Sequence, residues 1–225
     1  MFRKLMKIWS GQAFSSRIVK EFLFMLDSSE EMLSYAFKTL TKKGEAKEIQ
    51  KNIYKKDQSI NLKERDIRKQ VLIHLSTNPG CNLSACLALI SISKDAERLG
   101  DYIKNLVELD KLLKDSKKSD RKLFRKLFQE NGTELLALFK KVSSAFKNSD
   151  KDLAREAVNI GRDISKRCEE IIEEVVESDY TNREAVVLCL GARYMKRIAL
   201  HLSNIASSVI NPLSELDYIS EEISR

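Results

Sequence analysis

Apolar side chains recur along this chain at alternating steps of three and four residues, and no segment shows sustained alternation of apolar and polar residues. Steps of three and four return to the same face of an α-helix, so each run predicts a helix that packs one stripe against its neighbours. The clearest run spans residues 89–106, and its apolar positions are Leu89, Ile92, Ala96, Leu99, Ile103 and Leu106. We therefore predict an all-α fold.

Turn and capping residues bound six long helices. Gly44 ends the first helix, Asn78-Pro79-Gly80 forces a tight reversal after the second, and Asn211-Pro212 ends the sixth. Thr181-Asn182-Arg183-Glu184 has the form of a capping box that opens the sixth helix. The predicted ranges are 12–42, 45–76, 82–115, 121–146, 151–177 and 181–211, with a polar linker at 116–120 and a candidate break at Asn131-Gly132.

The third and sixth helices carry related sequences. KDAERLGDYIKNL (94–106) aligns with RYMKRIALHLSNI (193–205), and the alignment pairs Leu99 with Ile198 and Ile103 with Leu202. Each of the two helices follows a turn and another long helix. Because antiparallel helices joined by short turns pack as bundles, we predict two tandem three-helix bundles, residues 1–117 and 118–225.

A polar column runs along the third helix at strict four-residue steps, so its side chains stack on one side. At about 100° per residue the column falls opposite the apolar stripe, and we expect it to face solvent. A second polar set lies on one flank of the second helix, and antiparallel packing would bring both sets to one edge of the bundle. The six residues are Glu97, Asp101 and Asn105 in the third helix and Asp57, Asn61 and Glu64 in the second.

Two interpretations of these six residues stay open. Carboxylate and amide oxygens suit magnesium, calcium, manganese or iron better than copper or a thiolate-type zinc site. The alternative is a solvated face with local ion pairs, in which Lys94 or Arg98 neutralises Glu97. Gly100, at the edge of the apolar stripe, is predicted to let a neighbouring helix approach closely.

The second repeat lacks the column. The residues aligned with Glu97 and Asp101 are Lys196 and Leu200, and neither side chain can ligate a cation. Any metal is therefore expected in the first repeat alone. Leu200 is either an ordinary exposed leucine or part of a protein contact such as a dimer interface.

Charge and composition narrow the class of protein. The net charge is +7, but the 40 basic residues are mixed with 33 acidic ones and form no stripe with interleaved aromatics, so we do not expect nucleic-acid binding. No apolar stretch is long enough to span a bilayer. The basic N-terminal segment 1–11 is either a short docking helix or a segment that contacts a membrane surface. We expect a cytoplasmic protein.

The residues give no support for an enzyme. No Gly-rich phosphate loop is present, and no combination of nucleophile, histidine and carboxylate is recognisable. Neither His74 nor His201 belongs to a Glu-x-x-His motif, and His74 is expected to be a residue of a helix C-terminus. The four cysteines, at positions 81, 86, 168 and 189, have no CxxC spacing and lie in apolar contexts, as reduced core thiols do.

The sequence AERLGDYIKN (96–105) resembles the recurrent Glu-Arg-Ile-Gly-Asp motif of the PhoU family, helical phosphate-signalling proteins built from two three-helix repeats. The polar residues of the second helix and ARYMKRI (192–198) in the sixth support the resemblance. In architecture it covers essentially the whole chain, whereas the close motif match is confined to about a dozen residues.

This resemblance implies a regulator of phosphate uptake and of the phosphate-starvation response, not an enzyme. It implies contacts with the ATPase of a phosphate ABC transporter and with a phosphate sensor histidine kinase. Some members bind iron or zinc clusters through acidic motifs on their helices, and many are homodimers. The alternative is a helical protein that binds iron, zinc or magnesium and has no role in phosphate signalling.

Overall fold

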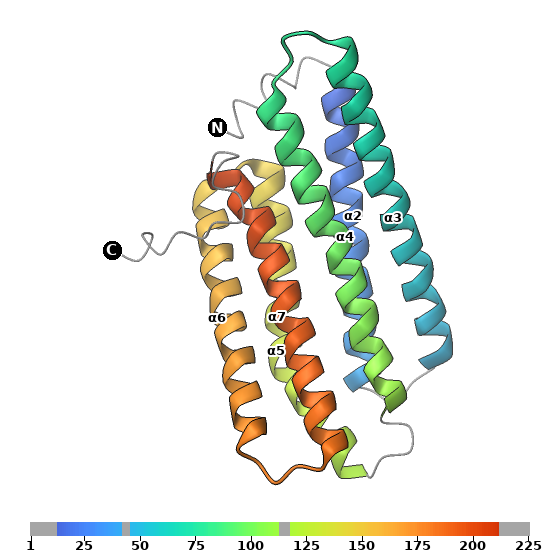
Figure 1. Cartoon of the computed structure of the whole chain (residues 1–225), viewed down its shortest axis with the longest axis vertical. Helices are drawn as coiled ribbons and strands as arrows, with labels where there is room; N and C mark the ends of the chain where they lie inside the picture. The colour runs from blue at the N-terminus through green and yellow to red at the C-terminus, as the bar shows by residue number, and fades with distance from the viewer. Residues whose placement is uncertain (1–12, 42–45, 113–117, 212–225) are drawn as a thin grey trace.

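The computed structural model describes residues 13–41, 46–112 and 118–211 (Figure 1). Each of these segments is helical apart from three turns between helices and the last residue, and no strand occurs in the described part of the chain. The predicted all-α fold is therefore confirmed. The helices are α2 (Ala13–Thr41), α3 (Ala46–Thr77), α4 (Leu83–Leu112), α5 (Lys118–Asn148), α6 (Lys151–Val176) and α7 (Asn182–Ile210).

Each helix packs along its neighbours, and the two repeats face each other. Helices α2, α3 and α4 contact one another, as do α5, α6 and α7, while α4 packs on α7 and α2 on α5. The α3–α4 turn lies at the upper end of the molecule in Figure 1 and the α6–α7 turn at the lower end. The two repeats therefore run in opposite directions, with α3 and α6 on the outside.

A single cluster of buried apolar side chains draws residues from all six helices. The six positions of the predicted stripe on α4 are at most 3 % exposed. Their counterparts on α7 include Met195, Ile198, Leu202 and Ile205, all fully buried. Burial along α4 and α7 thus agrees with the alignment of the two helices, while the domain boundary at residue 117 lies outside the described residues and stays a prediction.

The turn chemistry is as the sequence predicts. Cys81 N–H donates to Asn78 O at 3.1 Å across a turn in which Gly80 has φ +91°, the geometry that favours glycine after proline. Thr181 and Glu184 form the capping box at the start of α7. These contacts fix where α4 and α7 begin.

The fourth helix differs from its prediction. Helix α5 starts at Lys118, inside the predicted linker, and continues without a break through Asn131 and Gly132. Asn131 Nδ2 donates back to Leu127 O at 3.0 Å, and a Cβ on Gly132 would come within 2.8 Å of the Phe37 ring. The glycine therefore admits an aromatic ring of α2 and does not end the helix.

No described helix is long and apolar enough to cross a membrane. The N-terminal segment 1–11, for which the sequence predicts either a short docking helix or contact with a membrane surface, lies outside the described residues.

Candidate functional site

The six polar residues predicted as a site lie along α3 and α4, which pack side by side. They do not form an open face, so the predicted solvent exposure of the column is wrong. Asp57 and Glu64 are each 5 % exposed, and the side chains of Glu97 and Asp101 are 14 % and 28 % exposed. The reason lies in the packing of α4, which contacts α2, α3 and α7 and so has no wide face left for solvent.

Lys104 joins the two helices at this cluster. Its Nζ donates to Asp57 Oδ2 at 2.9 Å and to Asp101 Oδ1 at 3.1 Å. Burial alone would lower the pKa of Lys104, but the hydrogen bonds to the two carboxylates outweigh it and raise that pKa above its ordinary value. The lysine is therefore a fixed cation between α3 and α4.

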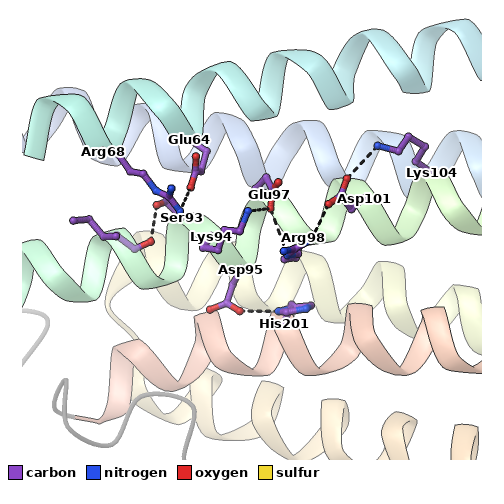
Figure 2. Close-up of polar contacts among 11 residues, drawn as sticks. Glu64, Arg68, Ser93, Lys94, Asp95, Glu97, Arg98, Asp101, Lys104 and His201 are labelled. Atoms are coloured by element: carbon purple, nitrogen blue, oxygen red, sulfur yellow. Dashed lines mark hydrogen bonds and ion pairs between the residues drawn. The ribbon is translucent and has the colours of Figure 1, made fainter.

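Other basic side chains neutralise the remaining carboxylates (Figure 2). Arg68 pairs with Glu64 at 2.5 Å, and Lys94 pairs with Glu97 at 2.7 Å. Arg98 lies 3.2 Å from Asp101. The local ion pairs expected as the alternative interpretation are present, although the carboxylates they neutralise are more buried than a solvated face would be.

Several oxygens of the cluster still lack a directed hydrogen bond. Asp57 Oδ1 and Asn61 Oδ1 are buried with no hydrogen-bond partner. Glu64 Oε1 and Glu97 Oε2 also accept no well-directed hydrogen bond, even though basic groups lie within ion-pair distance of both. Buried acceptors without partners are costly, and a cation would satisfy them.

Gly100 gives the Asp57 carboxylate its space. A Cβ at this position would lie 3.2 Å from Asp57 Oδ1 and 3.4 Å from Ile60 Cδ1. The predicted packing role of the glycine is therefore confirmed, and its neighbour across the interface is the acidic residue itself.

The oxygen donors of the cluster are of the type that a hard cation binds, but they lie too far apart to bind one in the present arrangement. Four carboxylates and Asn61 supply oxygen ligands of the kind that magnesium, manganese or iron accepts. Among the described residues, however, no three carboxylate oxygens of the cluster lie within 4.8 Å of one another. A cation would have to displace Lys104 and draw the two helices' carboxylates together. Asn105, the last residue of the column, is half-buried.

The second repeat has different chemistry at the matching place. Lys196 occupies the position of Glu97 and pairs with Glu169 on α6. Leu200, in the position of Asp101, is half-buried. The oxygen donors are thus concentrated in the first repeat.

A polar contact between the repeats was not predicted. His201 Nδ1 on α7 lies 2.7 Å from Asp95 Oδ1 on α4, and Asn204 Nδ2 donates to the same oxygen at 3.3 Å. The Tyr102 ring stacks on His201 with centroids 5.6 Å apart. The hydrogen-bonded residues are more than 100 residues apart in the sequence, so no local pattern could indicate the contact.

The outer face of α2 and α3 carries two shallow hollows of about 360 and 380 Å³. Phe24, which is 45 % exposed, borders both. Five basic residues and one acidic residue complete the charged part of the lining: Arg17, Lys20, Lys55, Lys56, Lys63 and Glu21. Arg17 and Lys63 pair with Glu21, and Lys56 pairs with Glu31, so the face keeps a small excess of positive charge around an exposed aromatic ring.

Fold and cluster together define a helical-bundle protein of two three-helix repeats, with its oxygen donors gathered between two helices of the first repeat. The PhoU domain model matches residues 22–109 and 128–209, which is most of the chain and falls in both repeats. The chain therefore belongs to the PhoU family.

A solved structure has the same fold. The crystal structure of the phosphate transport system regulatory protein PhoU from Streptococcus pneumoniae superposes with a TM-score of 0.74. The two sequences are 18 % identical, and the match covers 91 % of this chain and 95 % of that one. A search of curated protein sequences gave no significant match.

Proposed function

We propose that this protein regulates phosphate uptake and phosphate-starvation signalling through protein contacts in the cytoplasm, without catalysing a reaction. The observation that carries the proposal is the match of the PhoU domain to both repeats. The partners we propose are the ATPase of a phosphate ABC transporter and a phosphate sensor histidine kinase.

The basic face of α2 and α3 is the proposed contact surface for one of these partners. An exposed Phe24 between two hollows provides an apolar anchor, and the surrounding lysines and arginine favour an acidic partner surface. Phe24→Ala would remove the anchor without touching the core, because the side chain is 45 % exposed.

A cation at the acidic cluster is the proposed means of control. Lys104 and a divalent cation would compete for Asp57 and Asp101, so the interface of α3 and α4 would have two alternative arrangements. A partner that binds one arrangement better would respond to the cation. The unpartnered Asp57 Oδ1 and Asn61 Oδ1 support this proposal.

We further propose a homodimer. Leu72, Ile73 and Leu83 are 65 %, 53 % and 56 % exposed near the α3–α4 turn, and contact with a second copy would remove such surface from water. Light scattering of the purified chain tests this, and a monomer mass at micromolar concentration would contradict it.

The main proposal is tested by affinity purification of the chain from its native host under phosphate-replete and phosphate-starved conditions. We expect phosphate-transport components to co-purify in at least one condition, and Phe24→Ala to reduce their yield. Deletion of the gene should also change the rate of phosphate uptake. Recovery of no such component in either condition, together with unchanged uptake, would contradict the proposal.

The second candidate function is metal binding without phosphate signalling, and the same buried oxygens favour it. Elemental analysis of protein purified from its native host distinguishes the two. A stoichiometric metal that is lost in the Glu97→Ala/Asp101→Ala double variant, with no change in phosphate uptake on gene deletion, would favour the second candidate. A metal content far below one per chain, unchanged in the double variant, would exclude it.

A further inference from the structure

Three potential metal ligands meet at the turn between α3 and α4, away from the acidic cluster. His74, Cys81 and Cys86 each offer one ligand atom, and these atoms all lie within 4.8 Å of one another. His74 lies in the last turn of α3, Cys81 follows the reversal, and Cys86 lies in the first turn of α4. This is the one group of three His, Cys, Asp or Glu ligands that comes so close among the described residues.

The local fold holds this group in place. The Asn78-Pro79-Gly80-Cys81 turn has a fixed proline φ and a glycine at φ +91°, and Cys81 N–H bonds to Asn78 O. Asn82 caps α4 by accepting from Ala85 N–H at 3.0 Å. Both contacts constrain the backbone on either side of Cys81. The group therefore rests on an ordered turn.

The histidine ring is oriented by a neighbour in the same turn. Asn78 Nδ2 lies 3.2 Å from His74 Nδ1 and also donates to His74 O at 3.0 Å. The Asn78 amide group is a donor, so it holds the ring beside the turn with His74 Nδ1 as the acceptor in the metal-free protein. The sequence prediction of His74 as a helix C-terminal residue is correct in position but omits its two sulfur neighbours.

The three candidate ligands differ in burial. Cys86 is fully buried and His74 is 9 % exposed, whereas Cys81 is partly exposed and offers a route of entry.

We propose that His74, Cys81 and Cys86 form a binding site for Zn²⁺, with one imidazole nitrogen and two thiolates as ligands and a fourth coordination position left open. Thiolate and imidazole ligands suit zinc, whereas the oxygen donors of the acidic cluster suit harder cations. The bound ion would join the end of α3 to the start of α4. Each thiol releases its proton to solvent on binding, so about two protons leave per cation bound.

The second repeat provides an internal contrast. Its corresponding turn, residues 177–181, reads Glu-Ser-Asp-Tyr-Thr and contains no cysteine or histidine. The remaining cysteines, Cys168 and Cys189, lie on α6 and α7 and belong to no such group. The proposed site is therefore a property of the first repeat.

Titration of the reduced, metal-free full-length chain with Co²⁺, a spectroscopic probe for Zn²⁺, tests the proposal. We expect one Co²⁺ per chain, with strong thiolate-to-metal charge-transfer absorption that is abolished when Zn²⁺ displaces the probe. Cys81→Ser should abolish this absorption. Cys189→Ser is the matched control, since Cys189 is also a partly exposed thiol, and it should leave the absorption unchanged.

Replacement of Cys86 is avoided because the residue is buried and its loss could unfold the chain. His74→Gln is the second variant instead. Circular dichroism checks that this variant keeps its helix content. We expect His74→Gln to weaken Co²⁺ binding at least tenfold while the helix content is retained. Absence of charge-transfer absorption in the wild-type chain would overturn the proposal. So would absorption that is unchanged in Cys81→Ser, or a weak spectrum typical of oxygen ligands, which would point to the acidic cluster.

Discussion

Lys104 illustrates at the residue scale how a helical bundle can hold carboxylates inside. Asp57 is 5 % exposed, and its carboxylate would be strongly disfavoured without a counter-charge. The ammonium of Lys104 supplies that charge and at the same time binds Asp101. A side chain from α4 thereby compensates a buried charge on α3.

Replacing Lys104 with Met is expected to lower the free energy of unfolding by about 2 kcal/mol. Methionine keeps most of the apolar stem but leaves Asp57 buried without its cation, and an orphaned buried charge costs more than the pair contributes. Equilibrium urea unfolding followed by circular dichroism measures the change.

Two controls belong to this measurement. Lys51→Met removes an exposed lysine of α3, the helix that Lys104 contacts, and should change stability by less than about 0.5 kcal/mol. Adding Asp57→Asn to Lys104→Met should recover part of the loss, because the orphaned charge is then gone. Equal destabilisation by both lysine variants would contradict the role assigned to Lys104.

The buried thiol of Cys168 is expected to make the free energy of unfolding fall as the pH rises above about 9. Burial raises the pKa of its thiol from an ordinary value of 9.0 to about 12. Above pH 9 the unfolded chain therefore loses a proton that the folded chain keeps, and stability falls by up to about 1.4 kcal/mol per pH unit. We expect the wild type to lose about 1 kcal/mol more than Cys168→Ala between about pH 8 and 10, as measured by urea unfolding. Parallel pH profiles for the two proteins would show that the thiol is not responsible.

The site could be predicted from the sequence only in part. Four-residue spacing placed Glu97 and Asp101 on one side of a helix, and in the structure Lys104 joins Asp101 to Asp57 across the interface. Their exposure was wrongly predicted, because helical periodicity identifies the most apolar stripe but does not indicate which other faces a central helix covers. Lys104 was missed although it lies three residues after Asp101, a spacing that favours an ion pair.

At the scale of elements, α6 and α7 approach each other closely at Gly161. A Cβ there would lie 2.0 Å from Ser203 Oγ and 3.1 Å from the backbone oxygen of Ala199. The serine oxygen can rotate away, but the backbone oxygen cannot. The glycine therefore sets the distance between the two helices.

Gly161→Ala is expected to lower the free energy of unfolding by about 1–2 kcal/mol. Overpacking of this kind costs about 1–3 kcal/mol, and the better helix propensity of alanine returns at most about 1 kcal/mol. Thermal or urea unfolding measures the loss. The double variant Gly161→Ala/Ser203→Ala should be less destabilised than the sum of the single variants, since it removes the nearest clashing atom. A stabilised Gly161→Ala would contradict the close approach.

Helix limits were predictable where local chemistry decides them. The capping box at Thr181 and the proline–glycine turn before Cys81 are confirmed because their contacts span only a few residues. The Asn131-Gly132 break was wrongly predicted, since its glycine is explained by the Phe37 ring of another helix. The thiol neighbours of His74 were also missed, because their spacing across a reversal fits no short motif.

At the scale of the whole molecule, the repeats share one core and are also joined by polar contacts. Asp95 on α4 bonds to His201 and Asn204 on α7, and the rings of Tyr102 and Tyr194 lie 6.1 Å apart in the same interface. The two halves of the chain thus bury their surfaces against each other, and neither half has its interface covered without the other. We infer that the two repeats stabilise each other.

The last prediction follows from this shared core. We expect a single unfolding transition in urea for the whole chain, because the buried cluster draws on all six helices. A double-mutant cycle on Asp95→Ala and His201→Ala should give a coupling energy of about 1 kcal/mol, since Asp95→Ala leaves His201 without its carboxylate and His201→Ala leaves the buried Asp95 with Asn204 alone. Both variants should shift the midpoint and keep the transition single. Two separate transitions in the wild-type chain, or strictly additive effects of the two substitutions, would show that the repeats are independent units and that the contact between α4 and α7 does not couple them.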